Sequence, residues 1–172
     1  MKRIAVDMDG VLADVYSQFV KLHAEENGVK IPPEELVGKT EGEAFPDVLK
    51  FVNSPGFFRN APLMKDCRQV LEQIHNKYHL FIVSAALEFP NSLMEKQSWL
   101  NEHFPFISWK QIVFCGSKEI INADIMIDDH FKNLDFFTGE TILYTQPHNQ
   151  LTNSGNHHRV NSWKEIEEYL LR

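Results

Sequence analysis

Two short acidic motifs carry the chemistry that this sequence could perform. The first places Asp7 and Asp9 two residues apart, directly after the apolar run Ile4–Val6 and before Gly10. Ligands of open α/β sheets bind outside the carboxyl ends of the strands, where both carboxylates would lie. Asp7 could attack phosphorus as a nucleophile, and Asp9 could protonate the leaving oxygen and later take a proton from water. Gly10 would let the backbone turn sharply beside a phosphate group; the alternative is a solvated acidic turn.

The second motif is the adjacent pair Asp128 and Asp129, which follows the apolar run Ile125–Ile127. Neighbouring carboxylates at the end of a strand repel each other unless a cation lies close to both. A hard ion with oxygen ligands, such as Mg²⁺, would account for the pair. Capping of a helix near Phe131–Leu134 would account for only one of the two residues. The pair therefore favours a metal site.

Two further positions could hold a phosphate group. Ser84 ends the run Leu80–Val83, where its hydroxyl and the amide of Ala85 could donate to phosphate oxygens. Lys118 precedes the strand that bears the acidic pair, and its ammonium group could offset the charge of phosphate and carboxylates. Taken alone, either residue fits a turn serine or a solvated lysine.

The elements that must position these residues follow from hydrophobic patterning. Short apolar runs predict buried parallel strands, and amphipathic spacing predicts helices between them, which indicates an α/β fold with helices on both faces of a Rossmann-like sheet. The expected strands are Ile4–Val6, Leu80–Val83, Ile112–Phe114, Ile125–Ile127 and Ile142–Tyr144. The expected helical faces are Cys67, Val70, Leu71, Ile74 and Tyr78; Leu93, Leu100 and Phe104; and Trp163, Ile166 and Leu170 after a capping box at Ser162.

Residues 16–65 interrupt this rhythm and predict a helical cap inserted after the first strand. The segment holds five of the eight prolines, which divide it into short helices. A disordered linker is the alternative, but the segment is too rich in apolar side chains for that reading. The expected division is a core of residues 1–15 and 66–172 with a cap of 16–65. The polar stretch His148–His158 is expected to be an exposed loop.

Composition narrows the classes of partner. Acidic residues outnumber basic ones by 24 to 17, and the net charge of −7 argues against duplex nucleic acid or an anionic membrane as the main partner. The only cysteines, Cys67 and Cys115, form no CxxC pair, so reduced thiols in a cytoplasmic protein are expected. No run of residues is long and apolar enough for a membrane span. The oligomeric state stays open, a homodimer included.

The order of these motifs resembles that of the haloacid dehalogenase (HAD) superfamily, which consists mostly of aspartate-dependent phosphatases. The chain runs from a strand with Asp7 and Asp9, through a strand ending in Ser84 and then Lys118, to a strand with the Asp128–Asp129 pair. The resemblance implies that residues 16–65 are the helical cap of that superfamily.

A narrower resemblance is to the 5'(3')-deoxyribonucleotidases, which release phosphate from deoxyribonucleoside monophosphates with Mg²⁺. It rests on Asp7–Asp14, on Pro55–Arg59, on Asp128–Leu134 and on Pro147–Asn149. It implies a small nucleotide as substrate and Mg²⁺ as cofactor. The implied roles are nucleophile for Asp7; acid and base for Asp9; metal ligands for Asp7, Asp9 through its carbonyl, and Asp129, with Asp128 in support; phosphate binding for Gly10, Ser84, Ala85 and Lys118; and a substrate pocket that includes Val15, Phe57, Phe58 and His130.

The chain departs from that family at two places that bear on specificity. Ser84-Ala85-Ala86 stands where Thr-Ser-Pro is expected, and His130-Phe131 stands where Arg-Pro is frequent. Another small phosphate ester, such as a sugar phosphate or phosphoglycolate, is therefore an alternative substrate. A phospho-acceptor signalling domain is the alternative outside enzymes, but its acceptor would follow the third strand and it would carry no cap.

Overall fold

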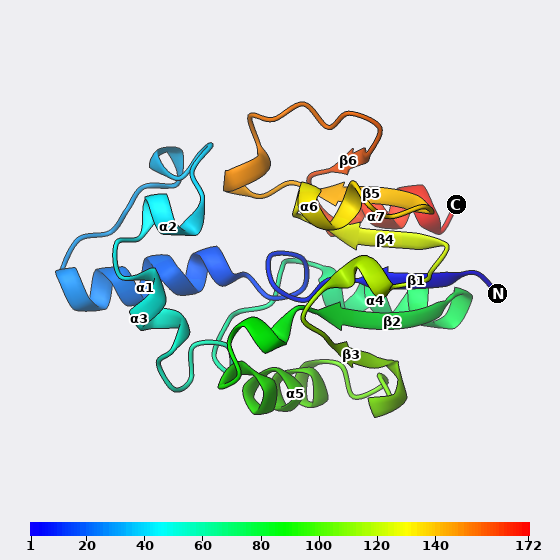
Figure 1. Ribbon diagram of the computed structural model, residues 1–172, viewed down its shortest axis with the longest axis horizontal. Helices are drawn as coiled ribbons and strands as arrows, with labels where there is room; N and C mark the ends of the chain where they lie inside the picture. Colours follow the sequence, from blue (N-terminus) through cyan, green and yellow to red (C-terminus); the bar gives the residue numbers. More distant parts are fainter.

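A six-stranded parallel sheet with the order β3-β2-β1-β4-β5-β6 forms the centre of the molecule (Figure 1). The computed structural model describes all 172 residues. The strands are β1 (Arg3–Val6), β2 (His79–Ser84), β3 (Ile112–Phe114), β4 (Ile125–Asp128), β5 (Glu140–Tyr144) and β6 (His158–Val160). The chain builds the sheet outward from β1 in both directions, so β1 and β4 flank the topological switch point. Ligands of such sheets bind in the crevice there, outside the carboxyl ends of the strands.

Both faces of the sheet are covered, as the strand pattern predicts. Alternate residues of β1 point to opposite faces: Ile4 and Val6 join a core of 34 buried residues, and Ala5 joins a second core of six. The larger core receives the buried faces of α4 (Cys67–Lys77), α5 (Ser92–His103) and α7 (Trp163–Leu170). The smaller core lies under α6 (Phe131–Leu134). The predicted α/β class is confirmed.

The insert between β1 and β2 is folded rather than extended. It contains α1 (Val15–Asn27), η1 (Pro33–Glu35), α2 (Glu41–Ala44) and α3 (Val48–Val52), which lie together beyond the carboxyl ends of the strands (Figure 1). The ring of Phe19 lies 5.0 Å from that of Phe45 and 4.6 Å from that of Phe57, between centroids. These rings are buried, so the linker alternative is wrong. The boundaries 16–65 stay a prediction.

The stretch His148–His158 is largely the exposed loop that the sequence predicts, since residues 150–153, 155, 156 and 158 are exposed. It contains the turn η5 (Pro147–Asn149), in which Asn149 is 1% exposed, and it runs into β6, which pairs in parallel with β5. Asn149 Nδ2 donates to the carbonyl oxygens of Tyr144 and Asp129, both at 2.8 Å. The sequence does not predict β6, because it is a three-residue edge strand with one buried side chain, Val160, and such a strand has almost no hydrophobic pattern.

The last helix, α7, holds the loop after β1 in place. Ser162 caps α7 by accepting from the amide of Glu165, and Trp163, Ile166 and Leu170 are buried as predicted. Trp163 Nε1 donates to the carbonyl oxygen of Val11 at 2.7 Å. The C-terminal helix therefore supports the segment that carries Asp7 and Asp9, although Trp163 and Val11 are 152 positions apart in the sequence.

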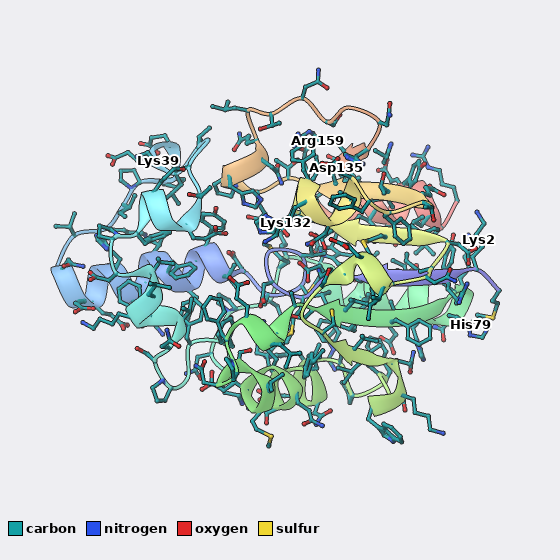
Figure 2. All side chains as sticks on the ribbon, in the orientation of Figure 1. Lys2, Lys39, His79, Lys132, Asp135 and Arg159 are labelled. Carbon is teal, nitrogen blue, oxygen red and sulfur yellow. The ribbon has the colours of Figure 1, made fainter.

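The remaining short turns are η2 (Ala86–Glu88), η3 (Trp109–Gln111) and η4 (Lys118–Ile120). Lys132 on α6 lies on the side of the sheet that faces the insert, whereas Lys2 and His79 lie at the opposite end (Figure 2). Cys67 and Cys115 are free thiols in buried positions, as expected. None of the helices combines the length and the apolar character required to cross a membrane.

Candidate active site

The loop after β1 is shaped by Gly10. Its φ of +76° lies in the left-handed region, and a Cβ atom there would come within 2.3 Å of Asp129 Oδ2. Glycine alone tolerates both conditions. The carbonyl oxygen of Met8 accepts from the amides of Leu12 at 2.8 Å and Ala13 at 2.9 Å, which closes the loop on itself. This tight loop brings the first acidic motif against the second.

Lys118 links the two acidic motifs. Its ammonium group lies 2.6 Å from Asp7 Oδ1 and 2.6 Å from Asp128 Oδ2, and the lysine side chain is 3% exposed. Burial lowers the pKa of Lys118, but the two carboxylates outweigh burial and hold that pKa above its ordinary value. Lys118 is therefore a permanent buried cation between the carboxyl ends of β1 and β4, and the surface-lysine alternative is wrong.

The two members of the Asp128–Asp129 pair have different surroundings. Asp128 is saturated, because it accepts from Lys118, from Asn133 Nδ2 at 3.0 and 3.1 Å, and from the amide of His130 at 2.9 Å. Asp129 is 2% exposed, and its Oδ1 atom has no hydrogen-bond partner. Its backbone carbonyl is held by Asn149 at 2.8 Å. Asp128 thus organises the site, while Asp129 presents a free oxygen.

The carboxylates of this cluster need one more cation, in addition to Lys118, to balance their charge. Burial raises the pKa of Asp7 to about 7, opposed by Lys118 and reinforced by Asp128 and Asp9. Burial, with Asp128 and Asp7, also raises the pKa of Asp129 well above its ordinary value. Carboxylate oxygens of Asp7, Asp128 and Asp129 lie within 4.8 Å of one another. Three buried carboxylates, one lysine and an unpaired carboxylate oxygen fit a hard divalent ion such as Mg²⁺.

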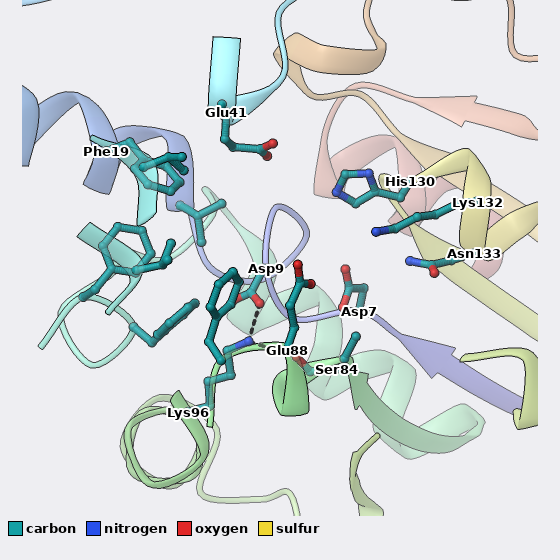
Figure 3. A pocket seen from close by; sticks show the side chains of 18 of the residues that line it. Asp7, Asp9, Phe19, Glu41, Ser84, Glu88, Lys96, His130, Lys132 and Asn133 are labelled. Atoms are coloured by element: carbon teal, nitrogen blue, oxygen red, sulfur yellow. Dashed lines mark hydrogen bonds and ion pairs between the residues drawn. The ribbon is translucent and has the colours of Figure 1, made fainter. Parts of the chain in front are cut away.

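Asp9 is held by a residue that the sequence did not single out. Lys96 on α5 reaches it with its ammonium group 2.5 Å from Asp9 Oδ2, and the same group donates to Ser84 Oγ at 3.2 Å (Figure 3). Asp9 Oδ1 has no hydrogen-bond partner. The signal for Lys96 was present but weak: it lies in the buried stripe of α5 with Ser92, Trp99 and Leu100. A lysine in an apolar stripe is rarely buried without a partner.

A cavity of about 300 Å³ opens over these groups, between the sheet and the insert (Figure 3). Most of the predicted site residues line it: Asp7, Asp9, Val15, Phe57, Phe58, Ser84, Ala85, Lys118 and His130. Three are buried and do not line it: Gly10, Asp128 and Asp129. The lining residues that sequence reasoning missed are Phe19, Glu41, Gly42, Val48, Val52, Glu88, Phe89, Lys96, Lys132 and Asn133. The floor is charged and polar, and the wall on the insert side is apolar apart from Glu41.

His130 occupies the rim of this cavity. Its ring stacks on that of His148 with 4.4 Å between centroids and an angle of 14° between planes. Burial and the neighbouring His148 lower the pKa of His130 to about 4, so the ring is neutral at pH 7. His130 is thus an uncharged, half-buried side chain at the cavity. The 5'(3')-deoxyribonucleotidases, which the chain resembles, frequently have an arginine at this position.

Comparisons with solved structures place this fold in the HAD class. A conserved haloacid dehalogenase-like protein of Agrobacterium tumefaciens superposes with a TM-score of 0.65 at 13% identity, covering 99% of this chain and 98% of that one. YfnB of Bacillus subtilis, whose structure was determined bound to magnesium, gives a TM-score of 0.62 at 12% identity and covers 99% of each chain. At these identities the likeness concerns the fold.

Comparisons of sequence define the family within that class. The family described as "5' nucleotidase, deoxy (Pyrimidine), cytosolic type C protein" matches residues 1–172. A 5'(3')-deoxyribonucleotidase of Bacillus subtilis is 36% identical over 99% of both chains. A Staphylococcus epidermidis protein that bears the same name provisionally is 39% identical over 98% of this chain and 96% of its own. The chain belongs to this 5'(3')-deoxyribonucleotidase family and is a phosphoric monoester hydrolase. The alternative of a phospho-acceptor signalling domain is therefore wrong.

Proposed function

We propose that this protein hydrolyses deoxyribonucleoside monophosphates to a nucleoside and phosphate, using Mg²⁺ and a phosphorylated aspartate. The observation that carries the proposal is the arrangement of charges at the cavity floor and directly next to it. Lys118 bridges Asp7 and Asp128 at 2.6 Å to each, and Asp129 offers an unpaired oxygen beside them. A dianionic phosphoryl group would be repelled by these carboxylates, so it can bind beside them only if cations balance their charge.

In the first half of the reaction, a carboxylate oxygen of Asp7 attacks phosphorus, and the bond from phosphorus to the nucleoside oxygen breaks. Asp9 gives its proton to that leaving oxygen. Lys118, the hydroxyl of Ser84 and the amide of Ala85 hold the phosphoryl oxygens, and all three residues line the cavity. The nucleoside then leaves.

In the second half, water attacks the phosphorus of the acyl phosphate, and Asp9 takes the proton from that water. The bond between phosphorus and the Asp7 oxygen breaks, which returns free Asp7 and inorganic phosphate. Asp7, Asp129 and the carbonyl of Asp9 would hold Mg²⁺, with Asp128 in support. A bound Mg²⁺ would neutralise charge on the carboxylates and on the phosphoryl oxygens.

The nucleotide assignment is supported by the cavity and by the relatives. About 300 Å³ is at the small end of the range for ligand sites and suits a single nucleotide. Val15, Phe57 and Phe58 form an apolar wall against which a base could pack. The relatives are named 5'(3')-deoxyribonucleotidases, and the family description includes the word pyrimidine. We infer that the enzyme prefers dUMP and dTMP as substrates. We also infer that it acts in the cytoplasm.

Phosphate release from a panel of esters tests the proposal. The panel contains dUMP, dTMP, their 3'-phosphate isomers, a ribonucleotide, a sugar phosphate and phosphoglycolate, each measured with Mg²⁺ and with a chelator. We expect the highest kcat/KM for a pyrimidine deoxyribonucleotide and no turnover with the chelator. A clear preference for the sugar phosphate or phosphoglycolate would overturn the substrate assignment, and full activity with the chelator would overturn the role of Mg²⁺.

A further inference from the structure

Lys96 is a buried charge that the reaction just described does not use. Its side chain is 3% exposed, and it lies on the same buried side of α5 as Trp99. A buried ammonium group is costly unless its donors are paired. An apolar residue at this buried position of α5 would be buried at much lower cost. Lys96 therefore needs a reason that packing does not supply.

The two partners of Lys96 give such a reason, because both have roles in the proposed reaction. One donor goes to Asp9 Oδ2 at 2.5 Å and another to Ser84 Oγ at 3.2 Å. A lysine has donors and no acceptor, so Ser84 must accept from it and keeps its own hydroxyl proton for another group. The carboxylate of Asp9 is tied by one oxygen, and its other oxygen has no partner in the protein. Lys96 thus orients an acid and base on one side and a phosphate donor on the other.

The same helix fixes the aromatic wall. The ammonium group of Lys96 lies 4.5 Å from the centre of the Phe58 ring, a cation–π contact. The adjacent Glu95 accepts from the amides of Gly56 at 2.6 Å, Phe58 at 3.1 Å and Arg59 at 3.1 Å. Two consecutive residues of α5 therefore set the position of Phe58 and of Asp9 together.

We propose that Lys96 is the positioning residue for proton transfer: by holding Asp9 and Ser84 against the Phe58 wall, it sets the carboxylate where the leaving oxygen of the substrate arrives. This inference rests on the proposed function, because it takes Asp9 as the acid. When the proton passes to the leaving oxygen, negative charge develops on Asp9 within reach of the lysine ammonium group. Lys96 therefore acts on the step that expels a poor leaving group.

The test compares two leaving groups in the full-length enzyme with Mg²⁺. The nucleoside alkoxide of dUMP needs a proton, whereas the phenolate of p-nitrophenyl phosphate leaves without one. The value of kcat/KM is used because it covers the steps up to the first release of product. We expect Lys96→Met to lower kcat/KM on the order of 100-fold with dUMP and less than about tenfold with p-nitrophenyl phosphate. Lys96→Arg, which keeps the donors, should recover part of the loss with dUMP.

The control is Gln97→Met, a substitution at the next residue of α5, which is exposed; it should change neither substrate's kcat/KM. Thermal melting checks that each variant folds, and Lys96→Gln replaces the methionine variant, with the same expectation, if that one does not. An equal loss with both substrates, or no loss with dUMP, would overturn the role of Lys96. Failure of the wild-type enzyme to cleave any nucleotide would instead overturn the proposed function. The comparison would then use glycerol 2-phosphate as the alkyl ester.

Discussion

The floor and the wall of the cavity are built by different means. The floor rests on buried charges beside the carboxyl ends of β1 and β4: Asp7 and Lys118 line the cavity, and short ion pairs join Lys118 to Asp7 and to Asp128, which lies outside the lining. The wall is a set of rings from the insert, in which the ring of Phe57 packs edge-on against that of Phe58, with 4.9 Å between centroids, and at a tilt against that of Phe19, with 4.6 Å between centroids. Charges on a rigid sheet edge can fix a phosphoryl group, whereas apolar rings can only exclude water and match a shape.

This difference assigns chemistry to the floor and selectivity to the wall. A change in the floor should affect every phosphate ester, because all of them share the phosphoryl group. A change in the wall should affect only substrates that carry a base. Lys96 belongs to both regions, since it contacts Asp9 on one side and Phe58 on the other.

The largest expected effect is at the nucleophile. Asp7→Asn should lower kcat on the order of 10⁴-fold or more with every substrate, because an amide oxygen does not form the acyl phosphate. The same change removes one negative charge from a crowded cluster, so the metal-free variant should melt at a higher temperature than the metal-free wild type near pH 7.5. Steady-state kinetics and thermal melting measure the two effects. Wild-type activity in this variant would contradict the assignment of the floor.

The next effect concerns the cation of the floor. Lys118→Met leaves Asp7 and Asp128 buried without their partner, which should destabilise the fold by about 3–5 kcal/mol. Denaturant unfolding measures this loss, and kcat/KM should fall with nucleotides and with p-nitrophenyl phosphate alike. The matched control is Lys110→Met, which changes an exposed lysine outside the cavity lining. Unchanged stability after Lys118→Met would show that the buried ion pairs do not organise the site.

A smaller effect is the pH dependence of stability in the metal-free chain. Burial raises the pKa of Asp7 to about 7 in the folded protein from an ordinary value of 3.8. The folded state therefore binds more protons than the unfolded state between these values, and stability falls as the pH rises from about 4 to about 7. We expect a loss of about 2–4 kcal/mol over this window, with Mg²⁺ restoring stability at the upper end.

Melting curves at pH 5 and pH 7.5, with and without Mg²⁺, measure this dependence. Asp7→Asn is the control and should flatten it. If the metal-free wild-type chain is more stable at pH 7.5 than at pH 5, the folded state does not raise the pKa of its buried carboxylates, and this prediction is contradicted.

The smallest effect is in the wall. Phe58→Leu keeps an apolar side chain and loses the ring, so it should raise KM for dUMP by about three- to tenfold and leave p-nitrophenyl phosphate nearly unchanged. Phe45→Leu is the control, because Phe45 is a fully buried ring of the insert that does not line the cavity. Equal effects of Phe58→Leu on both substrates would show that the wall does not read the base.

The sequence predicts the floor better than the wall for a physical reason. Asp7 directly follows β1, and Ser84 and Asp128 are the last residues of β2 and β4. Parallel strands bring their carboxyl ends to one edge, so local patterns suffice. The partners of those residues come from elsewhere. Lys96 lies on a helix, Asn149 lies in a stretch without hydrophobic pattern, and their contacts span 87 and 20 residues of sequence. Such pairings are properties of the packed molecule.

The insert illustrates the same limit. Its prolines and phenylalanines predict short helices with a core of their own, and α1, α2 and α3 are present. Which rings face the cavity depends on how these helices sit over the sheet. Phe19 and Phe57 line the cavity, whereas Phe45 and Phe51 do not, although all four are buried. Composition does not distinguish the two pairs.

The most direct test of the account is whether phosphate passes through Asp7. The full-length enzyme with Mg²⁺ is mixed with ³²P-labelled dUMP, quenched in acid within one turnover, and digested for peptide mapping. The account predicts a label on the peptide that contains Asp7, removed by hydroxylamine as expected of an acyl phosphate and missing in Asp7→Asn. Release of labelled phosphate within the first turnover, with no label on the protein at any time point, would contradict it.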